Sequence, residues 1–189
     1  MVDQSRSSYV EWSAILAGAV LALAFSAVMI QFGTAIGLAV DSPYRADELT
    51  SGGALAIGLW TLWIQVTASM AGGYLAGRLR APVAVVDAHE RETRDGMHGL
   101  LTWASGTVAV VVALAVAAAF AALTAHDPEA AKITPQVEQI RHNTAVIFAF
   151  VTGATSLVSG VAAWWAATKG GEHRDSPDQH THFVTFRKK

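Results

Sequence analysis

The chain has no cysteine among its 189 residues, which excludes disulfide bonds, zinc–thiolate sites and iron–sulfur clusters. Charge is also scarce, because only 15% of the residues are charged and the formal net charge is −2. Without a basic excess the chain has no field that attracts nucleic acid, so we expect no nucleic-acid partner. Metal or redox chemistry would have to rest on the seven histidines, and we predict neither a metal site nor a cofactor.

Long stretches without a charged side chain are the most informative positive feature. Four such runs of 26 to 29 residues are Trp12–Val40, Leu49–Gly77, Gly99–Ala125 and Asn143–Thr168. About 20 apolar residues, at about 1.5 Å rise each, already cross a hydrocarbon core of about 30 Å. Because 52% of the residues are hydrophobic, the sequence predicts an all-α fold, an integral membrane four-helix bundle.

The distribution of charge predicts the boundaries and the orientation of this bundle. We expect an N-terminal tail over 1–11, a transmembrane domain over 12–168, and a flexible C-terminal tail over 169–189. The expected spans are about 12–40, 53–77, 97–125 and 143–168. The two tails and the second loop hold ten of the 13 Lys and Arg residues, so the positive-inside rule places both termini in the cytoplasm.

The two halves of the chain resemble each other at a shift of about 90 residues. Ser69, Gly73, Tyr74 and Gly77 then align with Ser159, Ala163, Trp164 and Ala167. This pattern is typical of a tandem repeat of a helical hairpin. Helices rich in small residues also match each other by chance, so both interpretations stay open at this point.

Small residues recur at four-residue spacing inside the uncharged runs. They are Gly33 and Gly37 in the first run, Ser69, Gly73 and Gly77 in the second, and Ser156 and Gly160 in the fourth. In lipid, small faces let helix backbones approach closely and gain dispersion contact. We therefore predict that these residues pack helices together, either within the bundle or between copies in a homo-oligomer.

Ionisable side chains are absent from the interior of every run, which argues against proton-coupled carriers and voltage sensors. The strongest polar groups there are Gln31 and Gln65. We expect each carboxamide to hydrogen-bond a neighbouring helix, at roughly 0.6 to 2 kcal/mol. The alternative is that they line a permeation path or a polar substrate site.

The densest titratable cluster lies just before the third run and contains His89, Glu90, Arg94, Asp95 and His98. The simplest interpretation is a charged connector in which Glu90 pairs with Arg94 and Asp95 caps the next helix. A partner-docking site and a weak metal or catalytic site are the alternatives. The pair His89-Glu90 lacks the second histidine that a metalloprotease helix requires.

Several of these segments together resemble a known family. They are Trp12-Ser13-Ala14-Ile15, Ala17-Gly18-Ala19, the Gly33 to Gly37 region running to Ser42-Pro43-Tyr44, Gly72-Gly73-Tyr74-Leu75-Ala76-Gly77-Arg78-Leu79-Arg80, and His89-Glu90 through Arg94-Asp95 to His98-Gly99. The chain is similar, over roughly residues 9–124, to a family of uncharacterised proteobacterial multi-pass membrane proteins sometimes labelled PhnA-like. The resemblance implies a small protein of the bacterial inner membrane and implies no particular activity.

Taken together, these features favour a structural, interaction or accessory subunit over an enzyme. Such a protein would contact membrane lipids and form a homo-oligomer or part of a larger membrane complex. The alternative is an oligomeric channel or transporter for a small solute, with Gln31 and Gln65 along its path. A catalytic role would have to rest on His89, Glu90 and His98.

Overall fold

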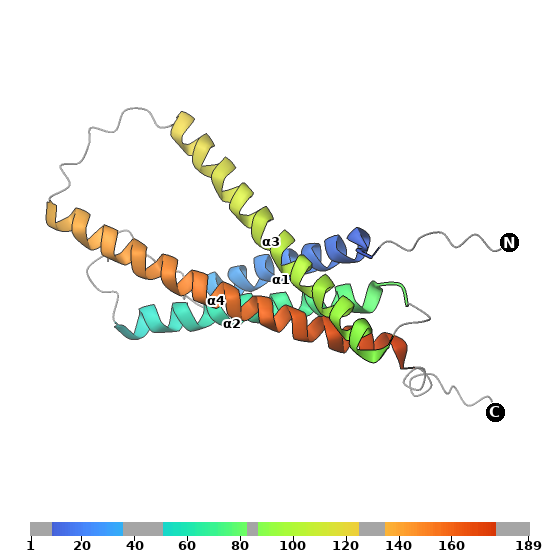
Figure 1. Ribbon diagram of the computed structural model, residues 1–189. Coiled ribbons are helices and arrows are strands. Elements are labelled where there is room, and N and C mark those ends of the chain that lie inside the picture. The colour runs from blue at the N-terminus through green and yellow to red at the C-terminus, as the bar shows by residue number, and fades with distance from the viewer. Residues whose placement is uncertain (1–8, 36–50, 83–86, 125–134, 177–189) are drawn as a thin grey trace, which may run out of the picture.

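The chain folds into helices, as the uncharged runs predict. A computed structural model describes residues 9–35, 51–82, 87–124 and 135–176, and these contain helices and no strand (Figure 1). The helices are α1 (Trp12–Ala35), α2 (Ser51–Leu79), α3 (Ala88–Thr124) and α4 (Pro135–Asp175). The all-α prediction is confirmed.

Among the described residues, three segments are long and apolar enough to cross a membrane: Trp12–Ala35, Ala88–Leu123 and Ala149–Asp175. These segments support the prediction of a membrane protein. Helix α2 has 29 residues, and its described residues do not join this set. The fourth span therefore stays a prediction, and positions 36–40 and 125 of the expected spans lie outside the described residues.

Two helices extend further than the expected spans. Helix α3 begins at Ala88 instead of near residue 97, and α4 continues to Asp175, where the sequence predicts a flexible tail from residue 169. Asp87 caps α3, because its Oδ1 accepts the backbone N–H of Glu90 at 2.8 Å. The prediction that Asp95 caps this helix is therefore wrong, and Asp95 is instead a buried residue inside α3.

Glycines and alanines bring the helices together. Helices α2 and α4 run in the same direction (Figure 1), and Gly73 and Gly77 lie against the backbone carbonyls of Ala163 and Ala167. A Cβ on either glycine would overlap these oxygens. The side chains that are both buried and apolar are mostly alanines: Ala14, Ile15, Ala19, Ile64, Ala68, Ala76, Ala163, Ala166 and Ala167. Close approach of backbones, and not interlocking of large side chains, is thus the main packing mode.

The α2–α4 crossing pairs residues that are equivalent in the proposed repeat, since Gly73 meets Ala163 and Gly77 meets Ala167. The contacts inside the α1–α2 hairpin differ from those inside the α3–α4 hairpin. Gly18 on α1 meets Gly72 on α2, whereas on α3 and α4 Gly99 meets Ala163. Equivalent hairpins would place the second contact near positions 109 and 162. The repeat consequently stays a prediction.

Helix α3 diverges from the other helices along its length (Figure 1). Its first turns pack against α2 and α4, whereas Val108–Leu123, which we call the far half of α3, is largely exposed. Only 6% of the most apolar window of α3 is buried. The bundle is therefore closed at one end and open at the other.

Candidate functional site

At the closed end of the bundle, charged and polar side chains join all four helices. The start of α1, the end of α2, the first turns of α3 and the end of α4 gather there (Figure 1). We call this region the ionic end. Its members are Tyr9, Glu11, Arg80, Glu90, Arg94, Asp95, His98, Arg174 and Asp175.

Asp95 is the central carboxylate of the ionic end. Its side chain is only 4% exposed, and its Oδ1 accepts from Nε of Arg80 at 2.5 Å and from Nη1 of Arg174 at 3.2 Å. Its Oδ2 accepts from Nη2 of Arg174 at 3.3 Å. A buried carboxylate needs such partners, because an uncompensated charge is costly in a low-dielectric environment. Asp95 thereby links α2, α3 and α4.

Arg174 also closes the C-terminal end of α2. Its Nη1 donates to the backbone carbonyls of Gly77 at 2.8 Å and Arg80 at 3.2 Å. The last carbonyls of a helix have no partner within the helix and carry its partial negative charge, so a guanidinium is favourable there. Asp175 accepts from Arg174 as well, at 2.8 and 3.0 Å. The two arginines and two aspartates of this network balance in charge.

His98 connects α3 to the start of α1. The side chain is 1% exposed. Its Nε2 lies 3.0 Å from the backbone nitrogen of Glu11, which donates its N–H, and its Nδ1 lies 2.7 Å from the carbonyl of Arg94. An imidazole that accepts through Nε2 and faces a carbonyl through Nδ1 must carry its proton on Nδ1. The carboxylate of Glu11 then accepts the N–H of Ala81, which ties α1 to the end of α2.

Tyr9 packs on the exposed side of the same α3 turns. Its hydroxyl donates to Oε1 of Glu90 at 3.1 Å, and its ring lies 3.9 Å from the guanidinium carbon of Arg94. Arg94 also donates to Glu90 at 3.1 Å, so the expected local pair of these two residues is present. His89 is exposed beside them.

The predicted cluster on α3 therefore splits among three neighbours. Glu90 and Arg94 face Tyr9, Asp95 faces the arginines of α2 and α4, and His98 faces the start of α1. Within the described residues, no group of three or more His, Asp or Glu side chains could hold a metal ion. The ionic end therefore holds the helices together through ion pairs and hydrogen bonds.

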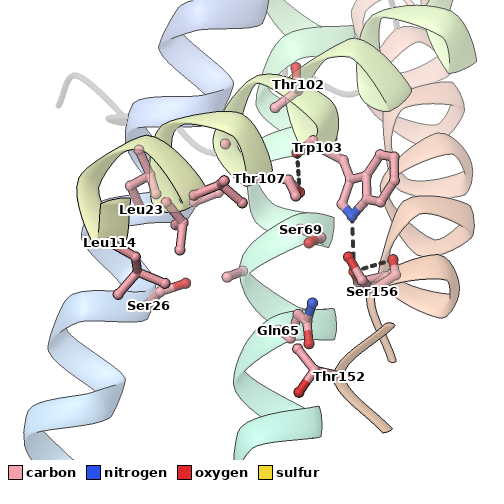
Figure 2. A pocket seen from close by; sticks show the side chains of 16 residues that line it. Leu23, Ser26, Gln65, Ser69, Thr102, Trp103, Thr107, Leu114, Thr152 and Ser156 are labelled. Atoms are coloured by element: carbon pink, nitrogen blue, oxygen red, sulfur yellow. Dashed lines mark hydrogen bonds between the residues drawn. The ribbon is translucent and has the colours of Figure 1, made fainter. Parts of the chain in front are cut away.

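A cavity of about 280 Å³ lies among the four helices, beyond the ionic end (Figure 2). We call it the inter-helix cavity. Helix α3 contributes more lining residues than any other helix, between Thr102 and Leu114. The other lining residues are Ala22, Leu23 and Ser26 of α1, Gln65, Ala68 and Ser69 of α2, and Thr152, Ser156 and Ser159 of α4.

Some of the polar groups around this cavity are already satisfied. The indole Nε1 of Trp103 donates to Oγ of Ser159 at 3.1 Å, and that hydroxyl donates to the carbonyl of Ser156 at 2.7 Å (Figure 2). Thr107 donates to the carbonyl of Trp103 at 2.9 Å, and Thr102 to that of His98 at 2.8 Å. The bond to Ser159 holds Trp103 against α4, whereas the two threonine bonds lie within α3.

Other polar groups are not satisfied. The side chains of Gln65, Ser69, Thr152 and Ser156 line the cavity and make no hydrogen bond with the described part of the chain. Gln31 is exposed on α1 and makes none either. Within the described residues neither glutamine bonds a neighbouring helix, so the expected hydrogen bonds stay a prediction. Gln65 points into a cavity because α3 and α4 separate beside it.

The small residues singled out in the sequence fall into two groups. Gly73 and Gly77 lie at the α2–α4 crossing, Gly160 lies against the ring of Trp103, and Gly33 lies against the indole of Trp60. Ser69 and Ser156 have the same spacing, but they line the cavity instead of a close contact. Gly37 lies outside the described residues.

The sequence does not predict the roles of several residues at the ionic end and around the inter-helix cavity. Arg80 and Arg174 read as ordinary positive charges at span ends, although they are the partners of Asp95. Trp103 reads as an interfacial anchor, although its indole nitrogen is hydrogen-bonded to Ser159 inside the bundle. One signal was available for the pairing of Asp95 with Arg80 and Arg174. All three charges lie near the ends of uncharged runs, and only Asp95 is negative.

Comparison with known proteins gives no further constraint. No protein-family model matches this chain, and no curated protein and no solved structure is significantly similar to it.

Proposed function

We propose that the chain is a four-span protein of the bacterial inner membrane with both termini in the cytoplasm. The three apolar helices, the distribution of Lys and Arg, and the family resemblance support this placement. Helix α2 would be the fourth span, because it packs between α1 and α4 and runs in the direction opposite to α1. The ionic end would then face the cytoplasm.

Single-cysteine labelling tests this topology without background, since the chain has no cysteine. We expect Glu92→Cys, exposed on the first turns of α3, to resist a membrane-impermeant maleimide in intact spheroplasts and to react after lysis. Glu129→Cys, at a sequence position between α3 and α4, serves as the matched position and should react before lysis. The reverse pattern would place the ionic end outside the cell.

We further infer that the protein is an interaction subunit whose far half of α3 binds another transmembrane helix. The observation that carries this inference is exposure on every side of that helix. Val110, Val111 and Val112 are consecutive, so they point about 100° apart, and all three are 45 to 60% exposed. A helix that is apolar all round needs either lipid or protein around it.

The composition of the far half favours protein. Ala109, Ala113 and Ala117 lie on one face at four-residue spacing, and all three are exposed. Small residues at this spacing allow a second helix to approach closely, which is the main source of helix association in lipid. The closed end of the bundle would hold the first turns of α3, and the far half would extend from them and present this face. No catalytic role is proposed, because His89, Glu90 and His98 do not converge.

Photocrosslinking in the native membrane tests the interaction. A photoreactive residue at Ala113 should give a discrete protein adduct, whereas the same residue at Val20, 64% exposed on α1, should give lipid adducts only. An adduct of twice the chain mass would assign the partner as a second copy, and any other defined mass would assign a different subunit. Lipid adducts alone at both positions would contradict the proposal.

A second candidate is a transporter for a small polar solute, which the inter-helix cavity favours. Four polar side chains that make no hydrogen bond with the described part of the chain line this one cavity, where they could bind a polar solute. Liposomes that contain the protein should then pass glycerol or urea, and Gln65→Leu should slow that flux while Gln31→Leu leaves it unchanged. Equal flux through empty and protein-containing liposomes would exclude this function.

A further inference from the structure

The inter-helix cavity has one polar side and one apolar side. In Figure 2, Gln65 and Ser69 follow each other along α2 and Thr152 and Ser156 lie beside them on α4. Leu23 and Leu114 lie on the other side, on α1 and α3, where Ser26 of α1 beside Leu114 adds one hydroxyl to a mostly apolar surface. Such a division fits a ligand with a polar head and an apolar remainder.

The polar side of the cavity indicates the chemistry of the ligand head that it could bind. Gln65 offers two N–H donors and a carbonyl, and the three hydroxyls offer donors and acceptors. No Asp, Glu, Lys, Arg or His lines the cavity. A charged head would therefore lie in an apolar environment without a counter-charge, which is strongly unfavourable. A neutral head with carbonyl or hydroxyl oxygens would satisfy the free groups.

The size and the surroundings limit the ligand further. A volume of about 280 Å³ equals about nine water molecules, which suits a single ring or a glycerol ester. A helix, about 10 Å across, does not fit. Val110, Val111 and Leu114 continue the apolar side along α3, where that helix leaves α4 (Figure 1). A hydrocarbon tail could lie along this divergence.

We propose that the inter-helix cavity binds the neutral, oxygen-bearing head of a membrane lipid, with its hydrocarbon tail between α3 and α4. This inference rests on the proposed position of the helices in the membrane. The head could be a quinone or the glycerol ester of a diacylglycerol, because both present carbonyl oxygens to Gln65 and the hydroxyls. Ligand binding would add contacts between two helices that otherwise separate.

Native mass spectrometry of the full chain in mild detergent tests the proposal with three probes. These are decylbenzoquinone, dioctanoylglycerol and dodecylbenzene, which has a similar tail but no oxygen. We expect saturable binding of at least one of the first two and none of dodecylbenzene. The stronger of the two oxygen-bearing probes identifies the head group, and equal binding of dodecylbenzene would overturn the proposal.

Substitutions assign the binding to the cavity. Gln65→Leu should weaken binding roughly 3- to 10-fold, the effect of one lost hydrogen bond, while Gln31→Leu on exposed α1 should not. If Gln65→Leu does not fold, Thr152→Val, which removes a hydroxyl without changing shape, serves instead. Binding that both cavity variants leave unchanged would overturn the proposal. Maleimide labelling and photocrosslinking do not use these lipid probes. If no probe binds, the proposed topology and the proposed binding of another helix to α3 are therefore still tested by their own experiments.

Discussion

Asp95 is the carboxylate that joins two arginines from other segments at the ionic end. It holds one arginine from α2 and one from α4, and all three side chains are at most 10% exposed. Replacing a buried ion pair by apolar groups can be neutral, but removing one partner leaves the others uncompensated. The network is therefore most sensitive to the loss of its central carboxylate.

We expect Asp95→Asn to lower the free energy of unfolding by about 3 to 5 kcal/mol, since Arg80 would lose its only carboxylate partner among the described residues. Denaturant titration in detergent micelles, followed by circular dichroism, measures this change. Glu172→Gln is the matched control, because the Lys169–Glu172 pair is exposed, at 43% and 55%, and should contribute less than about 1 kcal/mol. Equal effects of the two substitutions would show that burial of the network adds nothing.

His98 is sensitive for a different reason, because it satisfies backbone groups of two helices. His98→Ala would leave the N–H of Glu11 without its acceptor in a part-buried site, at a cost of about 1 kcal/mol. Amide hydrogen exchange should accelerate over Tyr9–Ile15. His89→Ala, which removes an exposed imidazole, should change neither stability nor exchange. Unchanged exchange at Glu11 in the His98 variant would refute the assigned role.

At the scale of the helices, contact between backbones decides the packing. Positions where glycine is required can be told from positions where it is only tolerated. Ala163 and Ala167 carbonyls occupy the places of a Cβ on Gly73 and Gly77, whereas nothing lies within 4 Å of such a Cβ on Gly58 or Gly153. The two kinds of glycine should respond oppositely to the same substitution.

Gly77→Ala should destabilise the protein by about 1 to 3 kcal/mol, because α2 and α4 must separate to admit the methyl group. Gly58→Ala should stabilise it by up to about 1 kcal/mol, since alanine favours a helix interior over glycine and meets no obstacle. Thermal unfolding of the two variants beside the unmodified protein compares the signs. A stabilising effect of Gly77→Ala would mean that the α2–α4 crossing is looser than described.

The sequence predicts the helices far better than it predicts how they meet. Uncharged runs indicate helices because a charged side chain is costly in lipid, and the described residues of three of these helices are apolar enough to cross a membrane. The sequence does not show which side of each helix faces its neighbours, because a helix that is apolar all round has no polar face. Spacing therefore does not distinguish Gly73, which packs, from Ser69, which lines a cavity. The Arg174–Asp95 pair, 79 positions apart, likewise depends on helix rotation and register.

At the scale of the whole molecule, the helices are held together at the ionic end and separate at the other end. Ion pairs and backbone contacts hold α3 and α4 at the ionic end, whereas the far half of α3 has few contacts. Regions with few packed contacts open at low free-energy cost. The angle between α3 and α4 should consequently vary in the isolated protein and be fixed by whatever binds between or beside these helices.

Spin labels on paired cysteines measure this angle directly, and the chain contributes no cysteine of its own. We expect a narrow distance distribution for labels at Glu92 and Glu172, which lie on exposed positions of α3 and α4 at the ionic end. Labels at Val116 and Val146, exposed on the diverging parts of the same helices, should give a broad distribution. A bound lipid head or partner helix would connect the two helices, so its addition should narrow the second distribution and leave the first unchanged. Equal widths at both ends in the isolated protein would mean that α3 is already fixed without a ligand, and the open end would then have no role in binding.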